Sequence, residues 1–222
     1  MNFAPPSKQR IASLTQAATT YHQQLTPDSP AAKYLESRGL TPDSARSFQL
    51  GYVADPVSGH ERYAGMLALP YINTQGVVAI RYRCISDHPE GLGVGCKELG
   101  HTKYIREPGD DAKMYNITTL TRPVRRIAVC EGEIDTQTAA QAGMPAVGVA
   151  GAQNWHSLFN RLIRGYQEVV VLADGDAAGL KLADAVMAVN ENARVCQMPD
   201  GLDVNNYYLR HGAAALVEKA GF

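Results

Sequence analysis

Three short apolar runs, each rich in β-branched residues and each followed at once by acidic residues and glycine, constrain this chain more than any other feature. They open the segments IAVCEGEID, EVVVLADGDAAG and ARVCQMPDGLD. Such runs are typical of buried parallel strands that end in a turn and continue into a helix. In an open α/β sheet, functional groups lie beyond the carboxyl ends of the strands. The acids predicted to meet at that edge are Glu131, Asp174, Asp176 and Asp203.

The charge of these four carboxylates predicts what they bind. Like charges come close together only where a cation lies between them. Oxygen ligands without a neighbouring histidine or cysteine suit Mg²⁺ or Mn²⁺. An isolated Asp-Gly-Asp is usually only a turn, but the acidic ends of the two other runs favour a metal site. Glu131 is suited either to bind metal or to act as a base.

Beyond residue 126, strands and helices alternate regularly. The expected strands cover residues 127–131, the AVGVAG segment, 168–174 and 194–198. The expected helices cover residues 135–142, 154–163 with Asn154 as N-cap, 178–190, 204–211 and 213–219. This order of βαβαβαβα predicts a parallel sheet that helices cover on both faces.

The first half of the chain combines helices with a hairpin. Apolar residues at helical spacing predict a helix over residues 8–24, and Pro30 opens a second helix that ends at Gly39. A third helix covers residues 41–47, with Thr41 as N-cap. The segments MLALPYI and VVAIRYRCI alternate with a period of two around the turn signal NTQG, which predicts a β-hairpin.

Basic residues gather in and after the hairpin. Arg81 and Arg83 alternate with Tyr82, which puts both arginines on one face of the second strand. That face is expected to be basic, although a solvated strand face would look the same. Residues 86–101 are glycine-rich and are expected to form a loop. The net charge of the chain is −1, so any site for nucleic acid must be local.

Cysteine and histidine usage predicts no zinc site in this chain. The four cysteines (Cys84, Cys96, Cys130 and Cys196) show neither a CxxC pair nor the spacing of a zinc ribbon, and the six histidines form no ligand pattern. Two of the cysteines lie in expected buried strands, which suggests reduced thiols and a cytoplasmic location. The sequence shows no signal peptide and no apolar run long enough to cross a bilayer.

Three motifs resemble the signatures of a TOPRIM domain: EGEIDTQTAAQAG, DGDAAG and PDGLDVNNYY. Upstream, AAKYLESRGLT, the hairpin and TKYIREPGDDAKMYN are similar to the N-terminal subdomain of the catalytic core of DnaG-type primases, in a phage or mobile-element style. The resemblance runs from about Ala31 to Gly212. It implies an α/β fold in which a TOPRIM parallel sheet flanked by helices follows a smaller α+β subdomain. The expected division is residues 1–29 for a tail and helix, 30–123 for the basic subdomain and 124–222 for the TOPRIM domain with its C-terminal helices.

The resemblance also implies roles for individual residues. It implies two acids beside the reaction, Glu131 and Asp135, of which Asp135 is equally suited to be a first-turn acid of its helix. It implies a metal set of Glu131, Asp174, Asp176 and Asp203. The basic residues implied to hold template, nucleotide phosphates or RNA are Arg81, Arg83, Lys103, Arg106 and Lys113, and Lys103 is also implied in catalysis. Glu133 and Asp184 are expected to be ordinary surface acids.

The chain departs from the family pattern in three places. Asn205 stands where a cellular primase has a further Asp, and this neutral amide is expected to weaken a second or third metal. Arg106 replaces a usual Asn. No zinc ribbon precedes the core, so we expect the ribbon to lie on a separate chain, to have been removed from this one, or to be dispensable.

The resemblance implies a primase catalytic core that makes short RNA primers on single-stranded DNA from nucleoside triphosphates, using Mg²⁺ or Mn²⁺. A replicative helicase is an expected partner. Two alternatives stay open: a TOPRIM nuclease that cleaves phosphodiesters at the same site, and a non-catalytic nucleic-acid-binding module. A topoisomerase is disfavoured, because the rest of the chain has no room for a domain with a tyrosine nucleophile.

Overall fold

A computed structural model describes residues 6–86, 96 and 99–222 of the chain, which divides into two compact units. Unit 1 comprises residues 1–37 and 41–111, and unit 2 comprises residues 38–40 and 112–222. The main division thus falls at Asp111, earlier than the 123/124 boundary expected from sequence. The physical reason is that Met114 and Tyr115 are buried, Met114 in the core of unit 2 and Tyr115 against the end of one of its strands.

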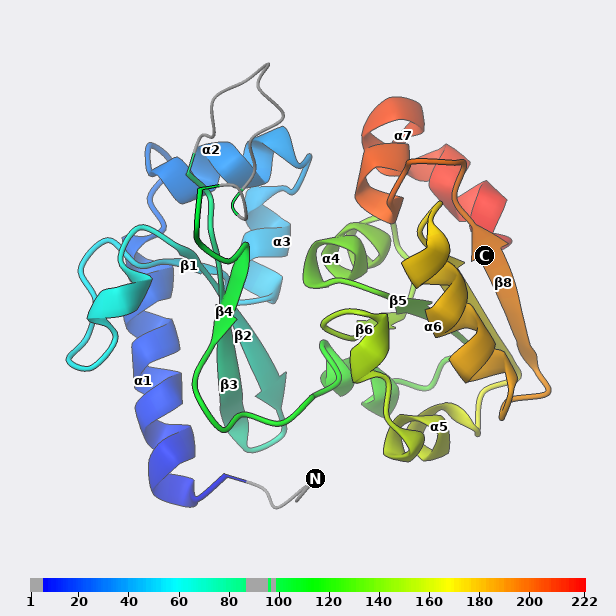
Figure 1. Ribbon diagram of the computed structural model, residues 1–222, viewed down its shortest axis with the longest axis horizontal. Coiled ribbons are helices and arrows are strands. Elements are labelled where there is room, and N and C mark those ends of the chain that lie inside the picture. The colour runs from blue at the N-terminus through cyan, green and yellow to red at the C-terminus, as the bar shows by residue number, and fades with distance from the viewer. Residues whose placement is uncertain (1–5, 87–95, 97–98) are drawn as a thin grey trace. The chain divides into compact units, whose positions relative to one another are not determined.

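Unit 1 is built on an antiparallel sheet in the strand order β1-β2-β3-β4 (Figure 1). Its strands are β1 (Gly51–Tyr52), β2 (Leu67–Asn73), β3 (Gly76–Arg83) and β4 (Tyr104–Arg106). Its helices are α1 (Lys8–Gln24), α2 (Pro30–Ser37) and α3 (Pro42–Ser47), with a 3₁₀ turn η1 (Glu61–Tyr63). The hairpin of β2 and β3 and the three helices confirm the sequence prediction, whereas the short strands β1 and β4 were not expected.

Helix α1 belongs to unit 1 rather than to a separate tail. The Ser7 side chain accepts the Arg10 backbone N–H and caps the helix at its predicted start. Leu14, Ala18 and Tyr21 recur at helical spacing and are buried against the β2–β3 hairpin, in a core that also includes Val77, Ile80 and Tyr82. This burial fixes the helix on one face of the sheet.

Unit 2 contains a four-stranded, fully parallel sheet in the order β6-β5-β7-β8. Its strands are β5 (Arg126–Cys130), β6 (Ala146–Gly148), β7 (Glu168–Ala173) and β8 (Ala193–Gln197). Its helices are α4 (Glu133–Gln141), α5 (Ser157–Ile163), α6 (Ala177–Met187) and α7 (Val204–Ala220), with the 3₁₀ turns η2 (Ile117–Thr121) and η3 (Ala152–Asn154). The predicted α/β class and parallel sheet are confirmed.

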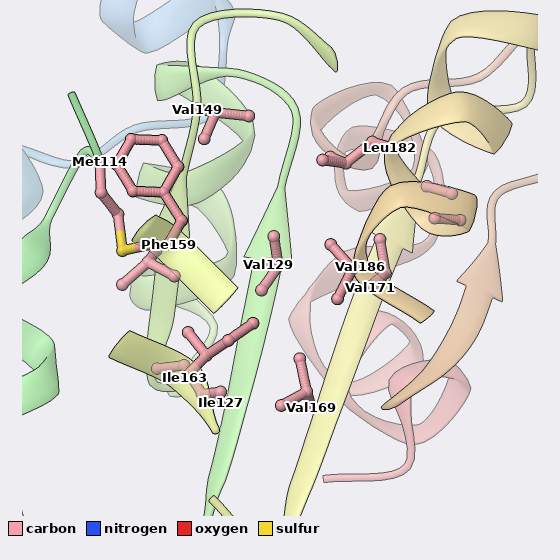
Figure 2. Close-up of a cluster of buried hydrophobic side chains, with 13 residues drawn as sticks. Met114, Ile127, Val129, Val149, Phe159, Ile163, Val169, Val171, Leu182 and Val186 are labelled. Atoms are coloured by element: carbon pink, nitrogen blue, oxygen red, sulfur yellow. The ribbon is translucent and has the colours of Figure 1, made fainter. Parts of the chain in front are cut away.

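Helices cover both faces of this sheet, because its strands alternate apolar residues that are buried on each side. Val129 and Val171 point to one face, where they pack with Phe159 of α5 and Leu182 of α6 (Figure 2). The opposite face packs against α4 and α7, through residues that include Ala139 and Leu216. A strand that is buried on both faces reads as a continuous apolar run, which is the pattern found in the sequence.

Three local differences from the sequence prediction have simple causes. Helix α5 begins at Ser157 with His156 as N-cap, because the preceding residues up to Asn154 form the 3₁₀ turn η3. The two expected C-terminal helices form one element, α7, interrupted at Gly212, where φ is 83°. Most of the expected glycine-rich loop, at 87–95 and 97–98, lies outside the described residues. Among the described helices, none has the length and apolarity that crossing a membrane requires.

Candidate functional site

The acidic strand ends of unit 2 lie along one edge of the parallel sheet. In the register of the sheet, Cys130 at the end of β5 pairs with Leu172 of β7, which pairs with Cys196 of β8. Glu131 directly follows β5 and Asp174 directly follows β7, so both carboxylates leave the sheet at the same edge. Asp203 follows β8 through a turn at the start of α7.

The Asp174 carboxyl group is partly buried and lies near several other acids. Its pKa is raised to about 8, first because burial penalises the charged form. Further acids add to the shift, in the order Asp135, Glu131, Asp203 and Asp176. The Asp174 Oδ1 atom is buried and has no hydrogen-bond partner in the described part of the chain. A cation bound to this oxygen would remove the cause of the raised pKa.

Glu131 is held in a similar environment at the end of β5. Burial is the main reason that its pKa is raised, and Asp176 adds a smaller increase. The Ala152 backbone N–H donates to Glu131 Oε1 at 3.4 Å, which opposes the shift. The Oε2 atom is buried without a partner among the described residues. One oxygen of Glu131 is therefore oriented by the Ala152 backbone, and the other is buried and available to a ligand.

Asp176 and Asp203 are both N-caps of helices that begin at this edge. Asp176 Oδ1 accepts the backbone N–H groups of Ala178 and Gly179, at 2.8 and 2.9 Å. Asp203 Oδ1 accepts the Asn206 N–H at 2.6 Å. Each cap uses one oxygen of its carboxylate and fixes the side chain, so the second oxygen can contact another group.

Two glycines let the backbone close tightly around Asp174. A Cβ atom on Gly175 would lie 2.1 Å from the Pro199 carbonyl oxygen, and one on Gly179 would lie 2.5 Å from the Asp174 backbone. The Gly175 N–H donates to the Leu202 carbonyl at 2.8 Å, which ties the turn after β7 to the turn after β8. The Asp-Gly-Asp motif therefore needs glycine for space between two turns.

Asp135 and Asn205 form a buried link between α4 and α7. Asp135 Oδ1 accepts the Asn205 backbone N–H at 3.0 Å, while the Asn205 side-chain amide donates to Thr138 Oγ1 and to the Arg38 carbonyl, each at 2.8 Å. Asn205 was expected from the family pattern to act on metal binding. In the structure its side chain is fully buried and holds other parts of unit 2 together.

Arg38 joins the site from a distant part of the sequence. Residues 38–40 belong to unit 2, where Gln141 Nε2 also donates to the Gly39 carbonyl at 2.7 Å. The Arg38 guanidinium lies 3.6 Å from Asp203 Oδ2 and brings a positive charge to the acidic edge. Sequence analysis missed this residue, since nothing in its local pattern distinguishes it from a surface arginine.

Glu133 is not the surface acid that the sequence suggested. Its side chain is only 1% exposed in the first turn of α4. The helix starts directly behind the strand end of β5, and this turn faces the inside of the unit. Asp184, in contrast, is exposed on α6, as expected.

The acidic edge fits a hard divalent cation. Among the described residues, no three of its acids bring carboxylate oxygens within 4.8 Å of one another. The four acids expected to hold the metal therefore do not form a closed cage. Mg²⁺ needs only one or two carboxylates, because it keeps several of its waters and also binds substrate phosphates. The buried oxygens of Asp174 and Glu131 that lack partners supply the negative charge that such an ion requires.

Arg81 and Arg83 share one face of the hairpin in unit 1, as predicted, but they are not equivalent. Both guanidinium groups lie over the Tyr104 ring, at 4.2 Å for Arg81 and 4.9 Å for Arg83. Arg83 also lies 5.1 Å from the Tyr34 ring, donates to the Tyr104 hydroxyl and is only 7% exposed. Arg83 is thus a packed side chain, whereas Arg81 is partly open to solvent.

The remaining basic candidates are divided between the units. Lys103, directly before β4, and Arg106, at the end of β4, are both exposed in unit 1. Lys113 belongs to unit 2 and lies close in sequence to Tyr115, whose backbone pairs with Gly148 at the carboxyl end of β6. The structure thus places Lys113 in unit 2, two residues before the strand-like contact of Tyr115, and the other four basic candidates in unit 1.

Comparison with known families and proteins gives consistent matches. A family model described as Toprim-like matches residues 128–208. The gene 57 protein of Mycobacterium phage D29 is 42% identical over 162 residues, which cover 71% of this chain and 99% of that protein. A DNA primase of Geobacillus stearothermophilus is 27% identical over 235 residues, which cover 90% of this chain. The match spans only 39% of the length of that primase.

Solved structures share the fold of the whole chain. The RNA polymerase domain of Mycobacterium tuberculosis primase DnaG aligns with a TM-score of 0.74 at 24% identity, covering 97% of this chain and 84% of that domain. A DnaG primase catalytic domain bound to single-stranded DNA aligns with a TM-score of 0.70 at 20% identity, covering 96% of this chain and 80% of that domain. At these identities the likeness concerns the fold.

Proposed function

We propose a function from one premise: this chain belongs to the family of DnaG-type primase catalytic cores, which carry a TOPRIM domain. Members of this family are nucleotidyltransferases in the broad sense and use divalent metal ions. We infer that this chain joins nucleoside triphosphates into short RNA primers on single-stranded DNA. The observation that carries the inference is the Asp174 carboxyl group, whose buried Oδ1 has no partner in the described structure and whose pKa is raised first by burial and then by neighbouring acids.

Asp174, Asp176, Glu131 and Asp203 are the residues proposed to hold Mg²⁺ or Mn²⁺. When bound, such an ion neutralises charge on the nucleotide phosphates and lowers the pKa of the attacking 3′-hydroxyl. The cap bonds of Asp176 and Asp203 fix these two carboxylates before any ligand arrives. This preorganisation supports metal binding, because little side-chain freedom is lost when the ion enters.

In the proposed reaction, the 3′-oxygen of the growing primer attacks the α-phosphorus of the incoming nucleotide. A new P–O bond forms while the bond to pyrophosphate breaks, and the hydroxyl proton must leave. Glu131 is the candidate acceptor for that proton, because burial raises its pKa and one of its oxygens lacks a hydrogen-bond partner among the described residues. Binding of metal by Glu131 is the other role open to it.

Asp135 is proposed to act beside the reaction rather than on the nucleotide. Its Oδ1 is committed to the Asn205 backbone, so it holds the first turn of α7 in place behind Asp203. Its negative charge is the largest electrostatic contribution to the raised pKa of Asp174. Asp135 therefore both holds the start of α7 in place and strengthens the attraction of the acidic edge for a cation.

The basic residues are proposed to bind phosphates. Arg81, Lys103 and Arg106 offer exposed or partly exposed cations in unit 1, and Lys113 offers one in unit 2. Arg83 is proposed to support this surface by packing against Tyr104, whose ring also lies beside Arg81. One structural neighbour is a primase catalytic domain bound to single-stranded DNA, which supports DNA as the template here. A replicative helicase and a separate zinc-ribbon chain are the proposed protein partners.

The test is incubation of the purified chain with labelled nucleoside triphosphates, single-stranded DNA and either Mg²⁺ or Mn²⁺. The Asp174→Ala variant serves as the negative control, and Asp184→Asn, which alters an exposed acid on α6, serves as the matched control. We expect short RNA products from the wild type and from Asp184→Asn, and a loss of at least about a thousandfold with Asp174→Ala.

Two other outcomes would favour the alternative functions. Shortened DNA without synthesis would assign nuclease activity to the same edge, provided that Asp174→Ala abolishes it. DNA binding with neither synthesis nor cleavage, in Mg²⁺ and in Mn²⁺ and after addition of a zinc-ribbon protein, would identify a binding module and overturn the proposal.

A further inference from the structure

A second group of side chains that can bind a metal lies in unit 1, and none of them belongs to the TOPRIM sheet. Ligand atoms of Cys84, Cys96 and His101 all lie within 4.8 Å of one another, and Cys84 Sγ is 3.3 Å from His101 Nε2. Within residues 6–86, 96 and 99–222, no other three Asp, Glu, Cys or His side chains meet that spacing. Neither the proposed polymerase chemistry nor the family match uses these residues.

The backbone of unit 1 brings the three residues together. Cys84 directly follows β3, and its N–H donates to the Lys103 carbonyl at 2.9 Å, which extends the pairing of β3 with β4. The His101 N–H donates to the Cys96 carbonyl at 2.9 Å, and Gly100, directly before His101, has a φ of 76°. Two independent backbone contacts therefore hold the ligands at the base of the connection between the strands.

We propose that Cys84, Cys96 and His101 bind one Zn²⁺ ion, which clasps the base of the connection between β3 and β4. Two thiolates and one imidazole form a soft donor set that suits zinc and not the hard cation proposed for unit 2. In tetrahedral zinc the sulfur atoms lie about 3.8 Å apart and a sulfur and a nitrogen lie about 3.6 Å apart, so only small movements are needed. A water molecule completes the fourth position.

The site depends on strand pairing, because Cys84 follows β3 and His101 precedes β4. The expectation that the chain has no zinc site depended on ribbon-type spacing in the sequence and could not include contacts made across a hairpin.

The zinc ion would fix a part of the chain that carries candidate DNA contacts. Lys103 lies just after His101, and Tyr104 packs under Arg81 and Arg83. An ion bound by Cys84 and His101 would link the end of β3 to the start of β4, close to Arg81, Arg83 and Lys103. The ion is thus proposed to order the basic hairpin, and it takes no part in the chemistry at the acidic edge.

The test is metal analysis of the whole chain, purified in excess Mg²⁺ so that the acidic edge is saturated. We expect about one zinc per chain by mass spectrometry of the released metal, and a thiolate absorption band when Co²⁺ replaces it. The variants Cys84→Ser, Cys96→Ser and His101→Ala should each lose more than about tenfold in zinc affinity. The matched controls Cys196→Ser, His211→Ala and Asp174→Ala should keep the wild-type zinc content.

Circular dichroism of each variant separates loss of a ligand from loss of the fold. Zinc retained by the three ligand variants, or lost from Asp174→Ala instead, would overturn the proposal. A chain that carries no zinc and forms a Cys84–Cys96 disulfide even with zinc present would overturn it as well. None of these measurements depends on primer synthesis, so the zinc site can fail while the proposed polymerase function stands, and the reverse.

Discussion

Arg83 in unit 1 and Asp174 in unit 2 are both ionisable side chains at the end of a strand, and their surroundings differ. Arg83 lies among aromatic rings and donates to the Tyr104 hydroxyl, so its guanidinium group packs against side chains of its own unit. Asp174 is surrounded by like charge and keeps a buried oxygen without a partner in the described structure. A buried charge that the fold stabilises is structural, whereas one that it leaves uncompensated indicates a missing ligand.

The two sheets explain how this difference arises. The antiparallel hairpin of unit 1 places Arg81 and Arg83 directly beside β4, whose Tyr104 can pack against both side chains. The parallel sheet of unit 2 brings strand ends from distant parts of the sequence to one edge, so their acids accumulate there. Crossover connections between parallel strands bring residues from distant segments to one edge, where a ligand can bind. A hairpin connection instead places residues of neighbouring antiparallel strands side by side, so they contact each other.

The largest effect on the acidic edge of unit 2 is expected from a substitution that fills the space beside Asp174. Gly175→Ala places a Cβ atom against the Pro199 carbonyl oxygen, and backbone cannot move aside as a flexible side chain can. We expect a loss of about 3 kcal/mol in the free energy of unfolding and loss of primer synthesis. Urea denaturation measures the first effect. Gly165→Ala is the matched control, because no atom lies within 4 Å of its Cβ position.

A smaller effect is expected from restoring the family acid. Asn205→Asp removes the amide that donates to Arg38 and Thr138, and it adds a buried charge beside Asp135. We expect the free energy of unfolding to fall by about 2 kcal/mol, with no gain in metal affinity. Thermal unfolding and Mn²⁺ titration measure these quantities, with Asn206→Asp as the control. Tighter metal binding in a stable Asn205→Asp variant would show that our structural role for Asn205 is wrong.

The raised pKa of Asp174 predicts how pH acts on the edge. Its folded value of about 8 lies above the ordinary 3.8, so its contribution to stability is complete below the ordinary value and is lost as pH rises through 8. A divalent ion reverses that loss by binding the charged form. We expect Mg²⁺ to stabilise the chain on the order of 1 kcal/mol more at about pH 8.5 than at about pH 6.

The comparison for this pH effect is Asp174→Asn, measured by thermal unfolding in Mg²⁺ and in chelator. An uncharged amide should make the metal-free chain more stable above neutral pH and should remove most of the difference between the two conditions. An equal response to Mg²⁺ in the wild type and in Asp174→Asn would place the ion elsewhere.

The smallest effects should separate the two arginines of unit 1. Arg81→Ala should lower affinity for single-stranded DNA and reduce the salt dependence of binding by about one phosphate contact. Arg83→Lys should leave that slope unchanged and lower the free energy of unfolding by about 1 kcal/mol, because lysine cannot reproduce the planar contacts with Tyr34 and Tyr104. Fluorescence anisotropy at several salt concentrations, combined with urea denaturation, measures both. An altered slope in Arg83→Lys would make Arg83 a direct contact.

Much of the fold could be predicted because its signals are local. The range of α1, the N-cap at Thr41, the β2–β3 hairpin and the parallel strands of unit 2 all follow from periodicity, caps and turn residues within short windows. The position of Asp174 at a strand end belongs to the same class, since an apolar run that stops at an acid can be recognised from a few residues.

Only the tertiary structure decided which charged groups are compensated. Asn205 meets Arg38 across most of the length of the chain, and Arg83 is buried by Tyr34 and Tyr104. The convergence of Cys84 with His101 likewise depends on strand pairing. The sequence by itself determined which residues carry charge and where strands end. Burial and partners were decided by contacts between distant segments, because desolvation and hydrogen bonding act through space and leave no local pattern in the chain.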